Sequence, residues 1–375
     1  MINEFTSNSE FKRVVEEQQI KGNRLKHFLK RKGIILLNNK AKDLAQASYT
    51  IFLGSEDLSE LQELMQVESN YQKSTMLVLT PVDEVDEEEE TNIVDTLLDE
   101  VNRYKTIAQG KYVIDSVNRK DDNNLHITFT YEKKVSGKMK FISTKKKTVN
   151  VHVESISESK DVKIDIRQTD SGDSKEFISF LESLKGKSTE ENEDIFNIKH
   201  ITLDNLEKNN KIEFFDLVSK KTLDEWRLVN ITGISVKKNT DSEENLEVVA
   251  DETEMSDDTK TTLVGITSAV LKGNGLRTNE FVQTCINEGF IITAMKFKYN
   301  HKSESKSIVV EINFSNSDIR IDIDKTYLEE EGREYITPLS FSEQDETIKL
   351  FQNIAYIVYN ELLEKQREEA LAVII

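Results

Sequence analysis

Apolar residues near the start of the chain recur at the spacing of amphipathic helices. Three sets follow this pattern: Phe11, Val14 and Val15; Leu25, Phe28 and Leu29; Leu44, Ala47, Ile51 and Phe52. Such spacing predicts short helices with one buried face. Gly33 stands where a left-handed residue would end the second helix, and a further helix is expected over 58–65. We therefore expect residues 1–80 to form a helical module.

Two later regions show the same order of helix, alternating strands and helix. The expected strands span 112–117, 125–131, 149–153 and 162–166 in the first region and 290–297, 307–314 and 319–323 in the second. Helices over 93–108 and 279–288 precede these strands, and amphipathic helices around 177–184 and 348–358 follow them. The fold class is thus α+β, with an N-terminal helical module followed by units of antiparallel sheet plus helix. An internal duplication explains the likeness, and so does the fact that this order of elements is common.

Acidic stretches at 83–90 and 241–258 mark the expected boundaries between domains. Seven of the eight residues in the first stretch are acidic, and the second holds nine acidic residues and no Lys or Arg. Such runs repel themselves and bury little apolar surface, which is typical of solvated linkers. The predicted organisation is 1–80 as the helical module, 91–186 as the first α+β unit, 195–240 as a middle segment rich in strands, and 259–375 as the second α+β unit.

Composition narrows the setting in which the protein works. The 375 residues carry a net charge of −19, and no apolar run approaches the roughly 18 residues that a membrane span needs. The polar N-terminus does not resemble a signal peptide. Cys285 is the single cysteine, so an intrachain disulfide is impossible; we expect it to be a small buried residue of a helix. These features predict a cytoplasmic protein without a membrane partner.

Sequence signatures of catalysis are missing. The five histidines are far apart in sequence and lack the spacing of a zinc site. The sequence has no Gly-x-Ser-x-Gly motif, and the glycine that a phosphate-binding loop would need before Gly186-Lys187-Ser188 is Leu181. We therefore assign no catalytic residue, no metal site and no cofactor.

Positive charge is concentrated near the N-terminus. Ten basic residues lie between Lys12 and Lys42 against only Glu16 and Glu17, so this segment carries about +8 and the remaining chain about −27. A positive patch on an acidic body can hold nucleic acid at one surface while the other surfaces repel it. The plain alternative is that these side chains form the solvated faces of two amphipathic helices.

The segments Leu25–Ile34 and Asn38–Leu44 together resemble a helix-extension-helix DNA-binding module of the SAP-like kind. The resemblance covers about a tenth of the chain. Ile34–Leu37 departs from the pattern, because this apolar link is longer than usual and could form a strand. The resemblance implies contacts to the phosphate backbone from Lys30, Arg31, Lys32, Lys40 and Lys42, which position a duplex without specifying its sequence. Arg24 and Lys26, in the same basic segment, complete the candidate set.

Two other sets of side chains could carry metal chemistry. Asp115, Glu132 and Lys134 imitate the carboxylate and lysine spacing of metal-dependent nucleases. Asp318, Asp322 and Asp324 share one face of an expected strand because their spacing is even. For the second set, a wet outer face of a sheet, with Ile319, Ile321 and Ile323 turned to the core, explains the pattern without a metal.

A basic hairpin is a further candidate nucleic-acid surface. It would combine aromatic residues that stack on bases with lysines that contact phosphates. Its members are Tyr131, Lys133, Lys134, Lys138, Lys140, Phe141, Lys145, Lys146 and Lys147. Exposed loop charges without a function account for the same residues.

The sequence favours a non-catalytic protein that associates with nucleic acid, DNA above all. The alternative from another class is an interaction or scaffold subunit that binds a protein partner or its own copies. A multi-protein assembly such as a bacterial anti-phage defence system would suit that role. The apolar C-terminus, Ala370–Ile375, is a candidate partner surface.

Overall fold

The computed structural model describes most of the chain in two compact units. The described residues are 8–16, 20, 22–37, 40–54, 56–57, 60–61, 71–82, 92–107, 111–134, 144–156, 160–168, 171–184, 196–238, 268–273, 276, 279–314, 318–330 and 332–374. One unit comprises 1–69, 109–113 and 129–148, and the other comprises 70–108, 114–128 and 149–375. The acidic stretches and most of the helix expected over 58–65 lie outside the described residues.

The N-terminal helices are α1 (Asn8–Glu16), α2 (Gly22–Arg31) and α3 (Ala41–Ser48). They enclose a small apolar core of their own. The buried members of this core are Phe11, Val14, Val15, Ile20, Leu25, Phe28, Leu29, Leu44, Ala45, Leu53 and Leu61. The helical spacing predicted most of this core correctly, but Ala47 is only half-buried and Phe52 is 75% exposed, because the third helix ends at Ser48.

The described strands form one twelve-stranded antiparallel sheet. They are β1 (Lys73–Thr80), β2 (Tyr112–Asp121), β3 (Asn124–Lys134), β4 (Thr144–Ser155), β5 (Val162–Gln168), β6 (Asn197–His200), β7 (Trp226–Lys238), β8 (Ser268–Lys272), β9 (Phe290–His301), β10 (Lys306–Asn313), β11 (Arg320–Glu330) and β12 (Arg333–Ile336). Their spatial order is β2-β3-β4-β5-β1-β11-β10-β9-β7-β8, with β6 paired to β1 and β12 to β11. Strand β1 thus joins the two meanders that the sequence predicted.

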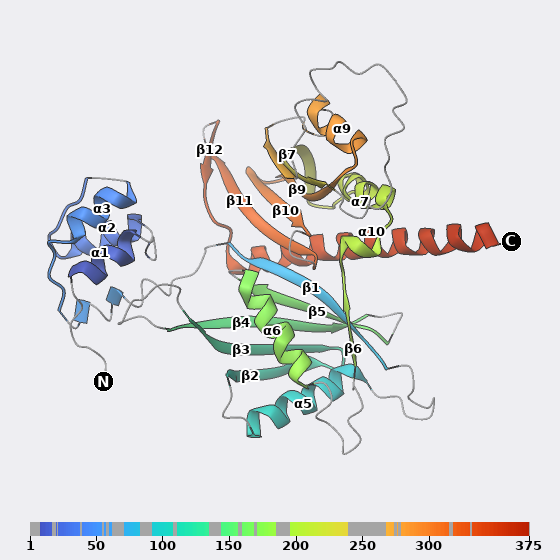
Figure 1. Cartoon of the computed structure of the whole chain (residues 1–375), viewed down its shortest axis with the longest axis horizontal. Helices are drawn as coiled ribbons and strands as arrows, with labels where there is room; N and C mark the ends of the chain where they lie inside the picture. The colour runs from blue at the N-terminus through green and yellow to red at the C-terminus, as the bar shows by residue number, and fades with distance from the viewer. Residues whose placement is uncertain are drawn as a thin grey trace, which may run out of the picture. The chain divides into compact units, whose positions relative to one another are not determined.

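Among the described residues, five helices accompany the sheet (Figure 1). They are α5 (Ile93–Ile107), α6 (Ser171–Leu184), α7 (Lys208–Lys220), α9 (Glu280–Asn287) and α10 (Phe341–Ile374). At β5, neighbouring side chains show which helix covers which face. Gln168 accepts from the backbone N–H of Ser174 in α6, whereas the Arg167 guanidinium pairs with Asp345 in α10. Adjacent strand residues point to opposite faces, so α6 and α10 lie on opposite sides of the sheet here.

The larger core lies between the second meander and the helices α7, α9 and α10. Phe214 and Phe215 of α7 pack edge-on against each other and against Phe314 after β10. Tyr299 of β9 packs against Phe351 of α10 with the ring centroids 5.0 Å apart. Cys285 is fully buried in α9, as its place on a helix face predicted. Within the described residues, no helix is long and apolar enough to cross a membrane.

The α+β class is confirmed, and the structure corrects two local expectations. Residues 73–80, expected in the helical module, form strand β1. Residues 212–217, in the middle segment that was expected to be rich in strands, lie within α7. The buried positions of α7 are Asn210, Lys211, Phe214, Phe215 and Val218; this spacing of three and four residues is helical. The middle segment is therefore only partly made of strands.

The two predicted α+β units have the same order of elements in the structure. A helix, a meander and a covering helix run from α5 to α6 and again from α9 to α10. Their strands belong to one continuous sheet. Whether this order arose by duplication, and whether the predicted domains fold separately, stay hypotheses.

Candidate nucleic-acid interface

The end of α2 is fixed by Gly33. The Ile34 N–H donates to the Leu29 carbonyl at 2.9 Å, and the Gly33 N–H donates to the Lys30 carbonyl at 3.0 Å. Gly33 has φ of +78°, the left-handed conformation that glycine adopts without a steric penalty. Together these bonds form a Schellman motif. The motif turns the chain out of the helix at the three consecutive basic residues 30–32.

The link between α2 and α3 is extended and alternates between core and surface. Ile34 and Leu36 pack against the module core. Ile35 and Leu37 point outward and are 71% and 87% exposed. The strand that the sequence left open for Ile34–Leu37 does not form, because these residues belong to no helix or strand. The link therefore places apolar side chains on the surface between two basic segments.

The N-terminus of α3 lacks a side-chain cap from its N-cap residue. Lys40 occupies the N-cap position with φ −76° and ψ 135°, and its carbonyl accepts from the Leu44 N–H at 3.0 Å. The first backbone N–H groups of a helix carry partial positive charge and suit an anion such as phosphate. Lys40 and Lys42 are exposed beside these groups, although the exposed Asp43 in the same turn opposes them.

The seven predicted binding residues fall into three groups. Lys30, Lys40 and Lys42 are exposed, and the described residues provide no hydrogen-bond or ion-pair partner for their side chains. Arg24 and Lys26 are half-buried and engaged in other contacts. The remaining two, Arg31 and Lys32, are exposed but paired with acidic side chains.

The ion pairs of Arg31 and Lys32 hold the module together. Arg31 pairs with Glu60, and Lys32 pairs with Asp57. The Lys32 hydrogen bond and the Gly54 backbone N–H lower the pKa of Asp57 from its usual value of 3.8. The Lys32 ammonium also lies 4.9 Å from the centre of the Phe28 ring. These two cations are therefore less available to phosphates than Lys30, Lys40 and Lys42.

Four large apolar side chains are exposed on this module, and one of them, Phe52, was wrongly expected on the buried face of the third helix. They are Ile35, Leu37, Tyr49 and Phe52. The Lys12 ammonium lies 5.9 Å from the centre of the Tyr49 ring. The alternation of Ile34–Leu37, which would place every second side chain outward, was the signal that could have found two of them.

The nuclease set finds no further support in the structure. Asp115 in β2 and Glu132 in β3 are exposed, and the side chain of Lys134 lies outside the described residues. No group of three or more His, Cys, Asp or Glu side chains in the described part of the chain could hold a metal ion.

The basic hairpin is partly buried. Tyr131 is 2% exposed and Lys147 is 6% exposed, so neither is placed to contact a nucleic acid. Lys146 is exposed, whereas Lys138, Lys140 and Phe141 lie outside the described residues. The stacking role considered for Tyr131 is therefore wrong.

The three aspartates around β11 do not form a wet outer face. Asp318 and Asp322 are 8% and 4% exposed, because cationic side chains cover them. Asp318 contacts His200, and Asp322 accepts from the Arg320 Nε at 3.0 Å. Asp324 pairs with the Lys296 ammonium at 3.1 Å. Asp318 thus has a histidine partner, whereas Asp322 and Asp324 pair with cationic side chains.

Comparison with known proteins gives no relative from which a function could be inferred. No family model, curated protein or solved structure matches the chain. The functional argument therefore rests on the geometry of the N-terminal module and on the chemistry of its surface.

Proposed function

We propose that this protein binds nucleic acid, DNA in the first place, through its N-terminal module and without catalysis. The observation that carries the proposal is the set of exposed cations at Lys30, Lys40 and Lys42, for which the described residues provide no ion-pair partner, beside a helix N-terminus that the Lys40 side chain does not cap. Lysines and backbone N–H groups of this kind neutralise and orient phosphates. The SAP-like order of helix, extended link and helix supports the same function.

Binding of this kind depends on charge and is weakly selective for sequence. The candidate residues offer ammonium groups, which recognise phosphates as point charges. The proposal therefore includes no preferred base sequence. Ile35 and Leu37 would lie at the edge of this surface, where apolar side chains can contact sugars or a groove wall.

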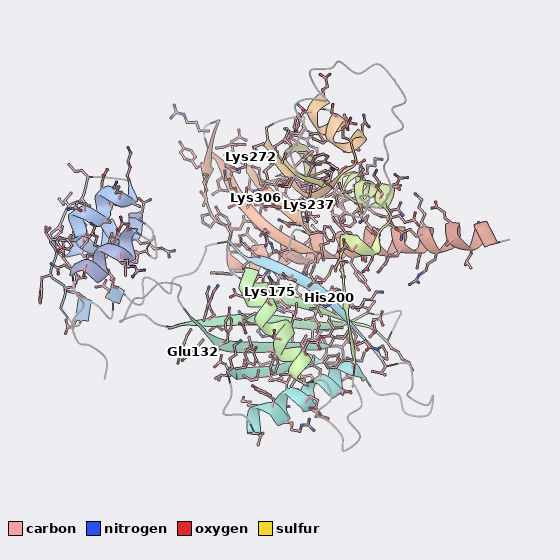
Figure 2. The ribbon with its side chains drawn as sticks, in the orientation of Figure 1. Glu132, Lys175, His200, Lys237, Lys272 and Lys306 are labelled. Atoms are coloured by element: carbon pink, nitrogen blue, oxygen red, sulfur yellow. The ribbon has the colours of Figure 1, made fainter. Side chains whose placement is uncertain are left out.

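Fluorescence anisotropy with short duplex and single-stranded DNA at low salt tests the proposal. The variant Lys30→Gln/Lys40→Gln/Lys42→Gln should weaken binding at least about tenfold. It neutralises fewer phosphates, so fewer counterions are released when it binds DNA. A matched control is Lys237→Gln/Lys238→Gln/Lys272→Gln, which removes three exposed lysines near the β7–β8 edge (Figure 2). No binding by the wild-type protein, or equal losses in both variants, would contradict the proposal.

A second candidate function is an interaction subunit that binds another protein or its own copies. Its support is the exposure of Leu37, Phe52 and Ile35, at 87%, 75% and 71%, on a small module. Size-exclusion chromatography with light scattering on wild type and on Ile35→Ser/Leu37→Ser separates the two functions. Self-association that the double variant loses, with DNA binding unchanged or absent, favours the interaction role.

A further inference from the structure

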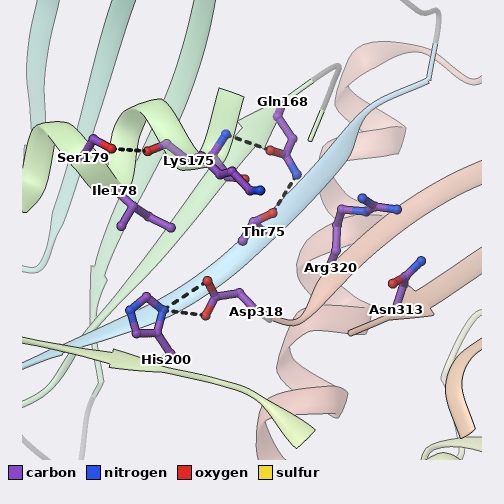
Figure 3. Close-up of a pocket in the computed structure, with 10 residues that line it drawn as sticks. Thr75, Gln168, Lys175, Ile178, Ser179, His200, Asn313, Asp318 and Arg320 are labelled. Atoms are coloured by element: carbon purple, nitrogen blue, oxygen red, sulfur yellow. Dashed lines mark hydrogen bonds and ion pairs between the residues drawn. The ribbon is translucent and has the colours of Figure 1, made fainter. Parts of the chain in front are cut away.

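A cavity of about 270 Å³ lies under α6 (Figure 3). The cavity opens at the point along β1 where the paired strand changes from β11 to β6. Residues 73–75 of β1 pair with β11, whereas residues 77–80 pair with β6. Between these two stretches, the Met76 N–H donates to the Ile319 carbonyl. The interruption between β11 and β6 leaves room for a polar pocket beside the sheet.

One wall of the cavity is a histidine held by a buried carboxylate. The His200 Nδ1 lies 2.9 Å and 3.1 Å from the two carboxyl oxygens of Asp318. Burial raises the pKa of Asp318, while His200 and the Ile201 N–H oppose that rise. The imidazole is 43% exposed and the carboxyl only 7%. Because Nδ1 faces Asp318, the described residues leave the Nε2 of His200 open to a ligand.

Two permanent cations line the same cavity. Lys175 projects from α6 toward β1, and its ammonium has no partner among the described residues (Figure 3). Arg320 uses its Nε for Asp322 at 3.0 Å, and no partner in the described part of the chain engages its two terminal nitrogens. Both side chains thus keep donors for an anion.

The opposite wall is held by hydrogen bonds. The Gln168 amide nitrogen donates to the Thr75 hydroxyl at 2.6 Å, and its carbonyl oxygen accepts from the Ser174 N–H at 3.1 Å. These bonds tie the first turn of α6 to β5 and β1. Ile178 adds an apolar surface to the lining. The wall is therefore fixed before any ligand arrives.

We propose that this cavity binds a small phosphate monoester, with the phosphoryl group held by Lys175, Arg320 and His200. Asp318 and Asp322 are already engaged by His200 and Arg320, so the unused donors outnumber the unused acceptors. Arginine and lysine donors make strong, charge-assisted hydrogen bonds to phosphate. The volume leaves room for a small organic group against Ile178. The site is independent of the nucleic-acid proposal.

Isothermal titration with inorganic phosphate and with ribose 5-phosphate tests the inference on the full chain. Lys175→Gln should weaken binding about tenfold or more. Folding should not change, because the side chain has no partner to lose; a thermal unfolding curve checks this. The matched control Lys272→Gln, an exposed lysine of β8, should bind like wild type.

A nuclear magnetic resonance titration of the histidine ring nitrogens gives a second readout. The Nε2 signal of His200 should move on adding ribose 5-phosphate, and the signal of the exposed His27 should stay in place. Absence of binding at millimolar phosphate would overturn the inference. Equal affinity for acetate, or unchanged affinity in Lys175→Gln, would also overturn it.

Discussion

A buried ion pair lies within β5, on the face where Arg167 also contacts Asp345 of α10. The Arg167 Nε donates to Asp165 at 2.7 Å, and the Ser74 hydroxyl donates to the other oxygen of that carboxyl at 2.6 Å. The side chains of Arg167 and Asp165 are 6% and 3% exposed. Such pairs add little net stability, but losing one partner leaves a buried charge without compensation.

Arg167→Met should therefore lower the free energy of unfolding by about 3–5 kcal/mol. The double variant Asp165→Leu/Arg167→Met removes both charges and should recover most of that loss. Urea denaturation followed by circular dichroism measures both. A loss below about 1 kcal/mol in the single variant would show that Asp165 finds another partner or becomes protonated without cost.

His152 makes the stability depend on pH. Burial, then the nearby Arg167 and His126, lowers its pKa from the usual 6.5 to about 4, although Asp165 and Asp345 oppose the shift. The folded state thus holds the neutral ring, while the unfolded chain binds a proton near pH 6.5. This contribution to stability is complete above pH 6.5 and is lost as the pH falls toward 4.

The free energy of unfolding of the wild type should fall more between pH 7 and pH 5 than that of His152→Gln does. The lowered pKa of His152 corresponds to at most about 3.4 kcal/mol in full and to about 2 kcal/mol between pH 7 and pH 5. His27→Gln changes an exposed ring and serves as the control. An identical pH dependence in His152→Gln and wild type would contradict the assigned shift.

The contact between Asp318 and His200 shows a kind of interaction that the sequence could not predict. The even spacing of Asp318 and Asp322 correctly placed them on one strand face, yet it predicted a wet face. The partner of Asp318 is His200, which lies 118 residues away. A pairing over that distance depends on the sheet order, and local spacing carries no information about it. For the same reason, the cavity around His200 could not be predicted.

At the scale of elements, the turn after α2 decides the shape of the module. Gly33 has a φ of +78°, and no atom lies within 4 Å of a Cβ added there. A substitution would therefore strain the backbone without causing a steric clash. Gly33→Ala should destabilise the module by about 1–2 kcal/mol. Hydrogen exchange of the α2 and α3 amides measures this effect. Gly54→Ala, which has ordinary φ and a nearest contact of 3.8 Å, should change exchange much less.

Elements with a periodic apolar pattern in the sequence were predictable, and elements without one were not. The meander strands that were predicted include β5, whose sequence alternates although the fold buries all seven of its residues. Their extents were less accurate, since β11 runs seven residues beyond its expected end. Strand β1 was missed because six consecutive positions, Ser74–Leu79, are buried, so it lacks alternation. A strand covered on both faces reads as a continuous apolar run. Helix α7 was missed because Phe214 and Phe215 are adjacent aromatics, which favour strands.

At the scale of the whole molecule, β1 joins the two meanders. It pairs with β5 on one edge and with β11 and β6 on the other. The sequence predicted both meanders but not their junction, because the pairing of β1 with β11 joins segments about 250 residues apart. Non-local pairings of this kind come from tertiary packing. The sequence therefore predicted the fold class and not the single sheet.

Charge asymmetry is the property of the whole chain on which the proposed function depends. The segment Lys12–Lys42 carries about +8 within a chain of net charge −19. The acidic remainder repels nucleic acid, so binding must come from local contacts at the module and must weaken with salt. For duplex DNA, the logarithmic salt slope changes by about 0.9 for each phosphate contact.

The most direct test of the central claim is the salt dependence of duplex binding, measured between about 50 and 200 mM salt. We expect the Lys30→Gln/Lys40→Gln/Lys42→Gln variant to show a slope shallower than that of wild type by about 2.7, since three contacts are lost. The Lys237→Gln/Lys238→Gln/Lys272→Gln control should keep the wild-type slope. A triple variant with the wild-type slope would show that these lysines do not contact phosphates, and the proposed interface would be wrong.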